Sequence, residues 1–574
     1  MPESDNEKLN SPKKPESKEM STEARLLLAF VLMGLVLFLT PYFLPKPPVT
    51  PKPVVKQGQP VKPDQAAAVK PPTPAEAPVT TPVDAATAQK EELFTVETQV
   101  YRVAFSNRGA VVHSWLLKNY KDASGKPLEV VNQLAVSKVY YPLSLWFKGQ
   151  NPSTDINQAL FVPKPTADGL GIDYEFSNGK TTARKSFRFE PKSYLVKVSS
   201  QVAEGTVGVP HLLTWRGGFG DEAVLNPYAG QHTIHYDLSA NKLVVTDAKS
   251  AKDGPVTATG NFSFAGVEDA FFAAVFLPAS GKQLELQSIA DSIPTPADKT
   301  KEQPYVGAAV GGDASNNLTL FLGPKDVELL RKVDPKLENL VDFGWFSFLA
   351  KPLFLALNYV NDRFVHNYGW SIILVTIIIN LLLLPLKLTS MKSMKKMSAL
   401  QPQIAAINEK YKSISLRDPR KAEQNQEVME LYKKNGVNPA GGCVPLLLQI
   451  PFFIAFYKVL SVAIEMRGAQ WLWVTDLSQP ETIAIRVLPI LMLVTQIGLQ
   501  KMTPQTGTDP SQQKMMMLMM PLMMAFFFYG ASSGLVLYWL TGNLVGLTQQ
   551  WLINRSMPTP ATQTTVTVKK KGSR

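Results

Sequence analysis

The chain has 574 residues and a formal net charge of +12, and it divides into two populations. Residues 92–340 alternate polar and apolar side chains, whereas residues 343–553 contain long apolar runs rich in Leu, Met and Phe. Positive charge that gathers at the ends of apolar runs favours a membrane protein in contact with anionic phospholipids. DNA or RNA binding is disfavoured, because no nucleic-acid-binding motif accompanies the charge. Cys443 is the only cysteine, which excludes an internal disulfide.

The first 91 residues predict a membrane anchor followed by a tether. Residues 1–25 are polar and basic, as in a cytoplasmic N-terminus, and residues 26–44 form an apolar run. A cleaved signal peptide is the alternative. No small-x-small cleavage site follows the run, so we expect an uncleaved transmembrane anchor. Residues 45–91 hold many prolines and too little apolar surface to fold, which predicts an extended linker.

Residues 92–340 have the pattern of an exported all-β domain. Short alternating runs such as FTVETQVYRVAFS, residues 94–106, recur between turns rich in Gly, Asp, Asn and Pro. Many short strands with turn signals predict a β-sandwich. The segment is long for one sandwich, so we expect an enlarged form.

Three motifs in this domain resemble functional sites without completing one. Gly179-Lys180-Thr181 lacks the glycine that a phosphate-binding loop needs five positions before its final one. His232 and His235 would point to opposite faces of a strand, so we expect surface histidines rather than a metal site. Glu268 and Asp269 have no neighbouring catalytic set, and we expect them to be solvated.

Residues 341–365 are apolar and aromatic, with polar residues interspersed. This pattern predicts an amphipathic helix in the membrane interface, and a packed helix that closes the soluble domain remains the alternative. Residues 369–386 then form an uncharged run that includes Asn380, and Lys387 ends it. A change from apolar to lysine-rich sequence marks a cytoplasmic membrane edge, so we expect the second transmembrane helix here.

Residues 387–438 predict a basic cytoplasmic hairpin. The segment carries eleven Lys or Arg and five Asp or Glu. Leu400, Ile404, Ile407 and Tyr411 are spaced by four and three residues, which places them on one face of a helix. Residues 413–419 interrupt this face, so we expect two antiparallel helices. A solvated basic tether is the alternative, and the regular apolar spacing disfavours it.

The remaining sequence predicts four more membrane spans. The expected segments are transmembrane helices at 443–464, 483–500, 515–529 and 534–553, a cytoplasmic loop at 501–514 and a basic tail at 554–574. With the anchor and the second span this gives six transmembrane helices. The bias of Lys and Arg then places both termini in the cytoplasm and the β-domain outside.

No enzyme motif stands out, and the informative feature is the polar content of the spans. Polar groups inside a bilayer are costly unless they meet each other or water. Ordinary hydrogen bonds between helices are one explanation. For the whole set, a water-accessible groove open to the cytoplasm is the sharper hypothesis. The groove residues that we expect are Thr376, Asn380, Lys387, Gln449, Gln496, Gln500 and Asn543.

Several ordered strings carry a family resemblance. NPAGGCVPLLLQIPFFIAFYKVL at 438–460, LPILMLVTQ at 488–496 and SGLVLYWLTGNL at 533–544 resemble the YidC/Oxa/Alb membrane insertase family. SNRGAVV at 106–112 and LGPKDVELL at 322–330 resemble the periplasmic domain of its Gram-negative form. The match covers nearly the whole chain beyond residue 92.

The resemblance implies a non-enzymatic insertase, without cofactor or metal, that inserts nascent inner-membrane proteins and helps them fold, alone or beside the Sec translocon. It implies an α-helical polytopic inner-membrane protein with a five-helix core around a hydrophilic groove, open to the cytoplasm and to lipid, and a periplasmic β-supersandwich. The hairpin would receive clients from the ribosome through basic residues, namely Lys392, Lys395, Lys396, Lys410, Lys412, Arg417, Arg420, Lys433 and Lys434. The chain departs from the family at Asn380, where many bacterial members have a groove arginine. Lys387 is the nearest candidate to supply that charge.

Two other functions remain open from the residues. A channel or secondary transporter would need a polar path to both faces, and the core spans contain no acidic residue for coupling. An anchored periplasmic assembly or sugar-binding protein would keep its activity in residues 92–340 alone.

Overall fold

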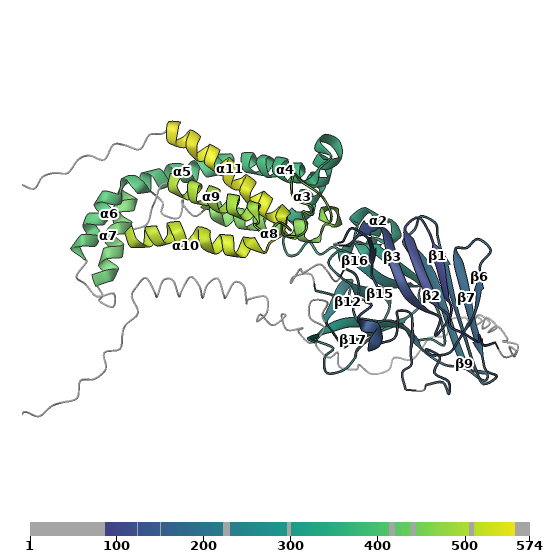
Figure 1. Cartoon of the computed structure of the whole chain (residues 1–574). Coiled ribbons are helices and arrows are strands. Elements are labelled where there is room, and N and C mark those ends of the chain that lie inside the picture. Colours follow the sequence, from purple (N-terminus) through teal and green to yellow (C-terminus); the bar gives the residue numbers. More distant parts are fainter. Residues whose placement is uncertain are drawn as a thin grey trace, which may run out of the picture.

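A computed structural model of the chain describes residues from 86 to 556. The exceptions are 123, 150, 222–229, 280, 295–299, 412–419, 438–443 and 504–509. The predicted N-terminus (1–25) and anchor (26–44) lie outside the described residues, as do most of the linker and most of the tail. The rest forms a β-rich domain followed by a helical unit, joined end to end (Figure 1). This confirms the order of the two parts that the sequence pattern predicts.

The β-domain contains three antiparallel sheets. The first has the order β1-β2-β3-β4, with β1 Leu93–Glu97, β2 Tyr101–Ser106, β3 Val111–Lys121 and β4 Pro127–Glu129. The second has the order β13-β12-β15-β16-β19-β9-β8-β7-β6 with β10 beside β9, and comprises β6 Val162–Pro165, β7 Gly171–Ser177, β8 Thr181–Phe189, β9 Leu195–Glu204, β10 Val207–Gly208, β12 His232–Asp237, β13 Lys242–Asp247, β15 Phe262–Glu268, β16 Phe272–Pro278 and β19 Ser315–Pro324. The third has the order β14-β17-β18-β11-β5, with β5 Leu145–Trp146, β11 Leu212–Trp215, β14 Val256–Gly260, β17 Leu284–Pro294 and β18 Glu302–Gly311.

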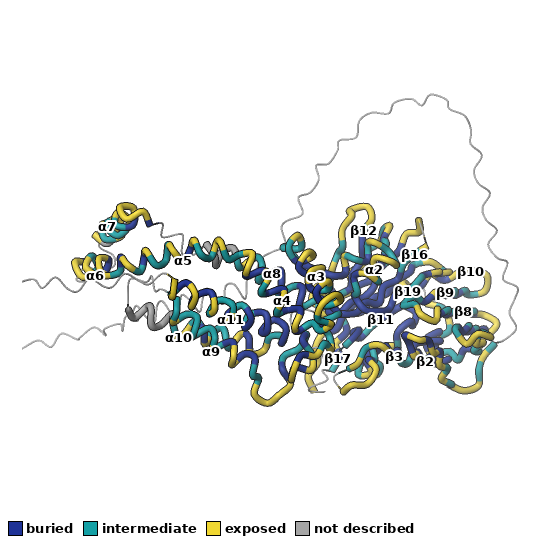
Figure 2. Tube along the Cα trace, turned by 90° about the horizontal axis from the view of Figure 1, so that it is seen from above, coloured by how far each residue is buried: buried dark blue, intermediate teal, exposed yellow. Residues whose placement is uncertain are grey.

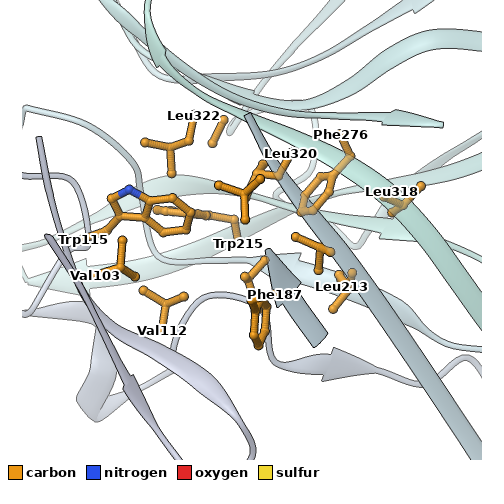
Figure 3. Close-up of a cluster of buried hydrophobic side chains, with 14 of the residues drawn as sticks. Val103, Val112, Trp115, Phe187, Leu213, Trp215, Phe276, Leu318, Leu320 and Leu322 are labelled. Carbon is orange, nitrogen blue, oxygen red and sulfur yellow. The ribbon is translucent and has the colours of Figure 1, made fainter. Parts of the chain in front are cut away.

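One apolar core lies between the three sheets. It contains Val103 and Trp115 from the first sheet, Phe187 and Leu320 from the second, and Trp215 from the third (Figure 3). The alternation along β8 explains its composition, because every second residue points inward to this core. The domain is therefore an enlarged sandwich, and its interior is filled by large apolar side chains, many of them aromatic.

Two expectations for this domain were wrong. His235 is buried and its ring centre lies 4.4 Å from that of Phe262, so it is not a surface histidine. Glu268 and Asp269 are also buried rather than solvated: the Lys325 ammonium donates to Glu268 Oε2 at 3.0 Å, and three backbone N–H groups donate to the Asp269 carboxylate. Sequence pattern places a residue on a strand face, but which faces become covered depends on the tertiary packing.

The β-domain and the helical unit share a continuous interface. A second apolar cluster runs from Phe264 and Phe321 on the sheet to Leu357 and Phe456 in the helices. The short helices α2 (Val327–Val333) and η2 (Pro335–Leu340) connect the two parts in sequence, and a further short helix, η1 (Ala135–Ser137), lies within the β-domain.

A buried ion pair joins the same two parts. Arg467, in the segment after α8, pairs with Asp221 of the β-domain and donates to the Lys121 carbonyl at 2.7 Å. Its guanidinium carbon also lies over the ring of Phe272, 5.3 Å from the ring centre. A charge that is removed from water needs such partners, so this contact fixes the outer end of the helical unit against the sheet.

The helical unit consists of α3 Ser347–Val360, η3 Asn361–Val365, α4 Tyr368–Leu382, α5 Leu384–Ala399, α6 Gln401–Lys410, α7 Arg420–Lys434, α8 Val444–Val462, η5 Ile464–Met466, α9 Val487–Met502, α10 Pro510–Tyr529 and α11 Ser533–Ser556. α11 packs against α4, α8 and α9, and α10 packs against α9. Helices α6 and α7 lie at the end farthest from the β-domain (Figure 1).

The helices differ in whether their length and composition suit a bilayer crossing. Among the described helices, none is by itself both long and apolar enough, while α3–η3 and α4 meet the requirement only as a pair that bends by 117°. The predicted span at 369–386 is divided at Leu383, because Pro385 stands in the first turn of α5 and begins a new helix.

Candidate functional site

The first polar cluster lies on α4 and continues across its end. The Thr376 hydroxyl donates to the Ile372 carbonyl at 2.6 Å, and Asn380 Nδ2 donates to the Thr376 carbonyl at 2.8 Å. The Lys387 ammonium then donates to Asn380 Oδ1 at 2.6 Å. The predicted stripe of Thr376, Asn380 and Lys387 is therefore one connected chain of hydrogen bonds, in spite of the break at Leu383.

Helix α11 adds a residue to this cluster. Gln549 Nε2 donates to the Asn380 backbone carbonyl at 3.4 Å. We define the α4 cluster as Thr376, Asn380, Lys387 and Gln549. Both Thr376 and Asn380 are buried, and Lys387 is half-buried, so a cation lies at the end of this polar, covered site that is farther from the β-domain.

A second polar cluster joins α9 to α11. Asn543 Nδ2 lies 3.3 Å from both the Met492 carbonyl and Thr495 Oγ1, and donates to them. The Trp539 indole donates to Gln496 Oε1 at 3.3 Å. We define the α9 cluster as Thr495, Gln496, Trp539 and Asn543.

The α4 and α9 clusters lie on two sides of α11. Because α11 packs against both α4 and α9, its polar residues face both neighbours. Each cluster places polar groups at a contact between helices, where a hydrogen bond contributes only about 0.6 kcal/mol on average.

The two remaining predicted residues lie outside these clusters. Gln500 is half-buried on α9, one turn after Gln496, and Gln449 is half-buried on α8. Among the hydrogen bonds between described residues, Gln449 takes part in neither cluster. The expected groove set did not include Gln549, Thr495 or Trp539. Thr495 and Gln549 are polar residues within the predicted spans, a signal that could have found them, whereas Trp539 carries no such signal.

The outer end of the helical unit is closed by the segment between α8 and α9, residues 463–486, which we term the outer loop. Ser533 donates to the Gln479 carbonyl from both its N–H, at 2.8 Å, and its hydroxyl, at 2.7 Å. The Gly534 N–H donates to the Leu477 carbonyl at 2.8 Å. These bonds satisfy the free N–H groups at the start of α11, and they hold the outer loop across the helix ends.

Buried side chains fill the space beneath the outer loop. Met466, Trp471, Val474 and Leu477 are all buried in the apolar cluster that also contains the helices. Trp471 lies directly against Gly369 at the start of α4, where an added Cβ would be 2.2 Å from its ring. The outer end therefore has an apolar seal.

The segment predicted as a cytoplasmic hairpin contains three helices rather than the two that we predicted. α5 extends from α4, and α6 and α7 pack through Leu400, Ile404, Tyr432 and Val437. This confirms the predicted apolar face at Leu400 and Ile404, whereas Ile407 and Tyr411 are not members of the cluster. Pro385 and Pro402 start new helices and so divide the first arm of the hairpin.

The basic residues of the hairpin are distributed over its surface. Lys392, Lys396, Lys410, Arg420, Lys433 and Lys434 are exposed. Lys395 is half-buried and donates to the Ile553 carbonyl of α11 at 3.1 Å, and Lys410 forms an ion pair with Glu427 at 3.1 Å. Lys412 and Arg417 lie outside the described residues. The exposed lysines and arginines present a positive surface to large anionic partners.

A metal centre has no support in the described residues, since no group of three or more His, Cys, Asp or Glu comes together there. The Gly179-Lys180-Thr181 motif forms the turn between β7 and β8, with Gly179 at φ +82°. It is a hairpin turn that uses glycine for its backbone conformation.

Comparison with known proteins assigns both parts of the chain. Residues 93–356 match the family described as "YidC periplasmic domain", and residues 360–560 match "60Kd inner membrane protein". The chain is 34% identical to the membrane protein insertase YidC of Syntrophus aciditrophicus (strain SB) over 562 residues, which is 93% of this chain and 99% of that relative. It is 35% identical to the corresponding insertase of Pelobacter propionicus over 567 residues, with 93% and 99% coverage.

A solved structure gives a further likeness. The structure described as "Active YidC insertase crystal structure with the first transmembrane domain resolved" is 19% identical, covers 81% of this chain and 94% of its own, and has a TM-score of 0.34. The assignment follows from the relatives with more than 30% identity over nearly their whole length. The chain belongs to the YidC family of membrane protein insertases, and is a non-enzymatic inner-membrane protein with a periplasmic domain.

Proposed function

We propose that this insertase accepts the polar segment of a client in a groove formed by the α4 and α9 clusters, open to the cytoplasm and to lipid. Thr376, Asn380, Lys387, Gln496 and Asn543 are the central residues. A hydrated groove lowers the cost of moving a polar segment part of the way through hydrocarbon. Burial of the client's own apolar helix then provides the free energy, so no nucleotide is needed.

The seal at the outer end is the observation that carries this proposal. The outer loop is bonded to Ser533 and Gly534 and is filled below by Trp471 and Leu477. Polar side chains on one side of the apolar seal favour a site that opens toward the cytoplasm. The same seal disfavours a channel or secondary transporter, which needs a path to both faces of the membrane.

Lys387 is the cation of the proposed groove. The family resemblance places an arginine at the position of Asn380, and here the Lys387 ammonium is hydrogen-bonded to that asparagine. The acidic part of a client would compete with Asn380 for the ammonium, since a carboxylate is the stronger acceptor. Insertion of an acidic-tailed client should slow in Lys387→Gln at low ionic strength, and unchanged insertion would contradict this role.

The proposed topology follows from the charges and from α3. We propose six spans, cytoplasmic termini and a cytoplasmic hairpin that contacts the ribosome, the Sec translocon or the nascent chain through its basic surface. α3 packs on α4 and α8 through Ala350, Leu353 and Leu357, while Phe348 and Tyr359 point away and are exposed. A helix that is apolar on both sides and lies at 117° to α4 is suited to the periplasmic interface of the inner membrane.

Crosslinking to a nascent chain tests the groove. A photoreactive amino acid at Asn380, Gln496 or Asn543 should form adducts with a ribosome-bound membrane protein. Ile378 is the matched control, because it is on α4, two residues from Asn380, and is exposed on the opposite side. Adducts from Ile378 alone, or from none of the four positions, would contradict the proposal. A truncated chain consisting of residues 92–340 that kept the essential activity would favour the periplasmic alternative.

A further inference from the structure

The outer loop carries an exposed apolar tip that the sealing role does not explain. Its buried side chains face the helices, but Leu472 is 66% exposed and the neighbouring Trp473 is 40% exposed. Ile483 and Ile485, just before α9, are also exposed. Four large apolar residues in one short segment are more than an aqueous surface ordinarily presents together.

The tip, residues 471–474, is a hydrogen-bonded turn. The Trp471 N–H donates to the Val474 carbonyl at 2.9 Å, and the Val474 N–H donates back to the Trp471 carbonyl at 2.8 Å. Leu472 and Trp473 are the two residues between these bonds, and Leu472 has φ +47°. A leucine in the left-handed region is strained, because its Cβ crowds the following carbonyl oxygen. The turn therefore holds Leu472 in a strained conformation in which its side chain is exposed.

The tip is anchored from below by a buried carboxylate. The Trp473 indole donates to Glu481, and Glu481 also accepts the Leu488 N–H at 2.8 Å, in the first turn of α9. The indole ring is therefore tied at its polar edge to the start of a helix, while the rest of the ring is available to an outside partner. Tryptophan with one polar and one apolar edge is typical of membrane interfaces.

The position of the tip identifies that partner. Trp471 contacts Trp370 at 5.7 Å between ring centres, and Trp370 is the third residue of α4. Exposed apolar side chains follow along α4, at Leu374 and Ile378, and others follow along α9, at Ile490 and Val494. In an inner-membrane protein such helix surfaces face lipid. The tip lies next to the outer ends of these helices, so lipid also surrounds the tip.

We propose that the turn at Leu472–Trp473 inserts into the outer leaflet of the bilayer and acts, together with Ile485, as an interfacial anchor for the outer seal. The partner is a phospholipid bilayer surface. The anchor is separate from α3 in the sequence and is attached to different helices, α9 and α11, through Glu481 and Gln479. It would keep the seal in register with the membrane while the cytoplasmic side of the unit receives clients. The inference depends on membership of the inner-membrane family and is independent of the proposed groove.

Depth measurement by spin labelling tests the anchor. Cys443→Ser leaves no other cysteine, so Leu472→Cys can be labelled with a nitroxide in the full-length protein in phospholipid vesicles. The label should be several-fold more accessible to oxygen than to a water-soluble nickel complex, relative to a label at Ser239→Cys. Ser239 lies in the exposed turn between β12 and β13.

Two results would overturn the proposal. A Leu472→Cys label as accessible to nickel as the Ser239→Cys label would mean that the tip is in water. A label protected from both reagents would mean that protein, such as a second copy of the chain, covers it.

A second variant separates the apolar tip from the fold of the turn. Leu472→Asn should keep the turn, because asparagine adopts the left-handed conformation readily. With a label at Ile485→Cys, this variant should lose most of the oxygen preference. An unchanged oxygen preference at Ile485 would mean that Leu472 does not hold the loop in the membrane.

Discussion

The β-domain and the helical unit bury their residues in different ways. Trp115 and Trp215 are completely covered inside the β-domain, and its charged residues lie mostly at the surface. The helical unit also has an apolar core, but Leu382 and Phe526 are exposed on its outside, while Asn380 and Gln550 are covered inside. In Figure 2 the strands of the β-domain are largely buried, whereas α5 and α9 are mostly exposed or half-buried. A domain folded in water hides its apolar side chains, whereas helices in lipid gain little from doing so. The proposed groove assigns the buried polar residues of the helical unit to client binding.

The largest expected effect is in the β-domain core. Trp115 has its ring 5.3 Å from that of Tyr101, perpendicular to it, and is fully buried. Trp115→Ala should lower the free energy of unfolding of the β-domain by about 3–5 kcal/mol, because it leaves a cavity. Urea unfolding followed by circular dichroism measures this.

Trp345→Ala is the matched control, since Trp345 is 92% exposed. It should change the unfolding midpoint very little. Equal losses in the two variants would mean that the β-domain does not depend on the core described above.

The next effect is at the junction of the two parts. Arg467→Met removes the cation that pairs with buried Asp221 and should cost about 3 kcal/mol. Hydrogen exchange of the backbone at Phe271 and Phe272 should increase. Lys458→Met is the control: its pair with Asp342 is more exposed, so the loss should be at most about 1 kcal/mol. If the two variants behaved alike, the junction would not be held by its buried pair.

The stability of the β-domain should depend on pH through one buried histidine. Burial lowers the pKa of His211 to about 4, below its usual value. Its Nδ1–H donates to the Val209 carbonyl, since a carbonyl can only accept, so Nε2 accepts from the Ser200 hydroxyl. The folded state therefore holds the neutral ring and the unfolded state binds the proton.

The β-domain should therefore lose stability as the pH falls. The contribution of His211 to stability is complete above about pH 6.5 and is lost as pH falls toward 4. Between pH 7 and pH 5 the loss should be about 2 kcal/mol. His211→Asn should remove this part of the pH dependence, as measured by unfolding at a series of pH values. An unchanged pH dependence in the variant would assign it to other groups.

The smallest effect on stability is expected in the helical unit. Asn543→Leu removes the hydrogen bonds to Met492 and Thr495, which should cost about 0.6 kcal/mol. Client insertion should fall much more than this stability change suggests. Thermal unfolding in detergent and an insertion assay in vesicles measure the two. A large loss of stability with normal insertion would reverse the interpretation of the polar clusters.

Much of the architecture could be predicted from the sequence, because the period of the apolar residues is local. The alternation in β8 and the apolar face of α6 are examples. The break at Leu383 was not predicted, although Pro385 marks it in the sequence. Pairings between distant residues could not be predicted in this way. The bond from Gln549 to the Asn380 carbonyl depends on how α11 crosses α4, and the burial of His235 depends on what covers its sheet. The resemblance to a family supplied the function, which residue spacing alone left open.

Water access from each side of the membrane tests the central claim most directly. In a Cys443→Ser chain, Asn380→Cys and Gln496→Cys can be exposed to a membrane-impermeant thiol reagent in vesicles of either orientation. The reagent should modify both positions from the cytoplasmic side, and Leu477→Cys, beneath the outer loop, from neither side. Modification of Asn380→Cys from the periplasmic side, or from neither side, would contradict a groove that opens only to the cytoplasm.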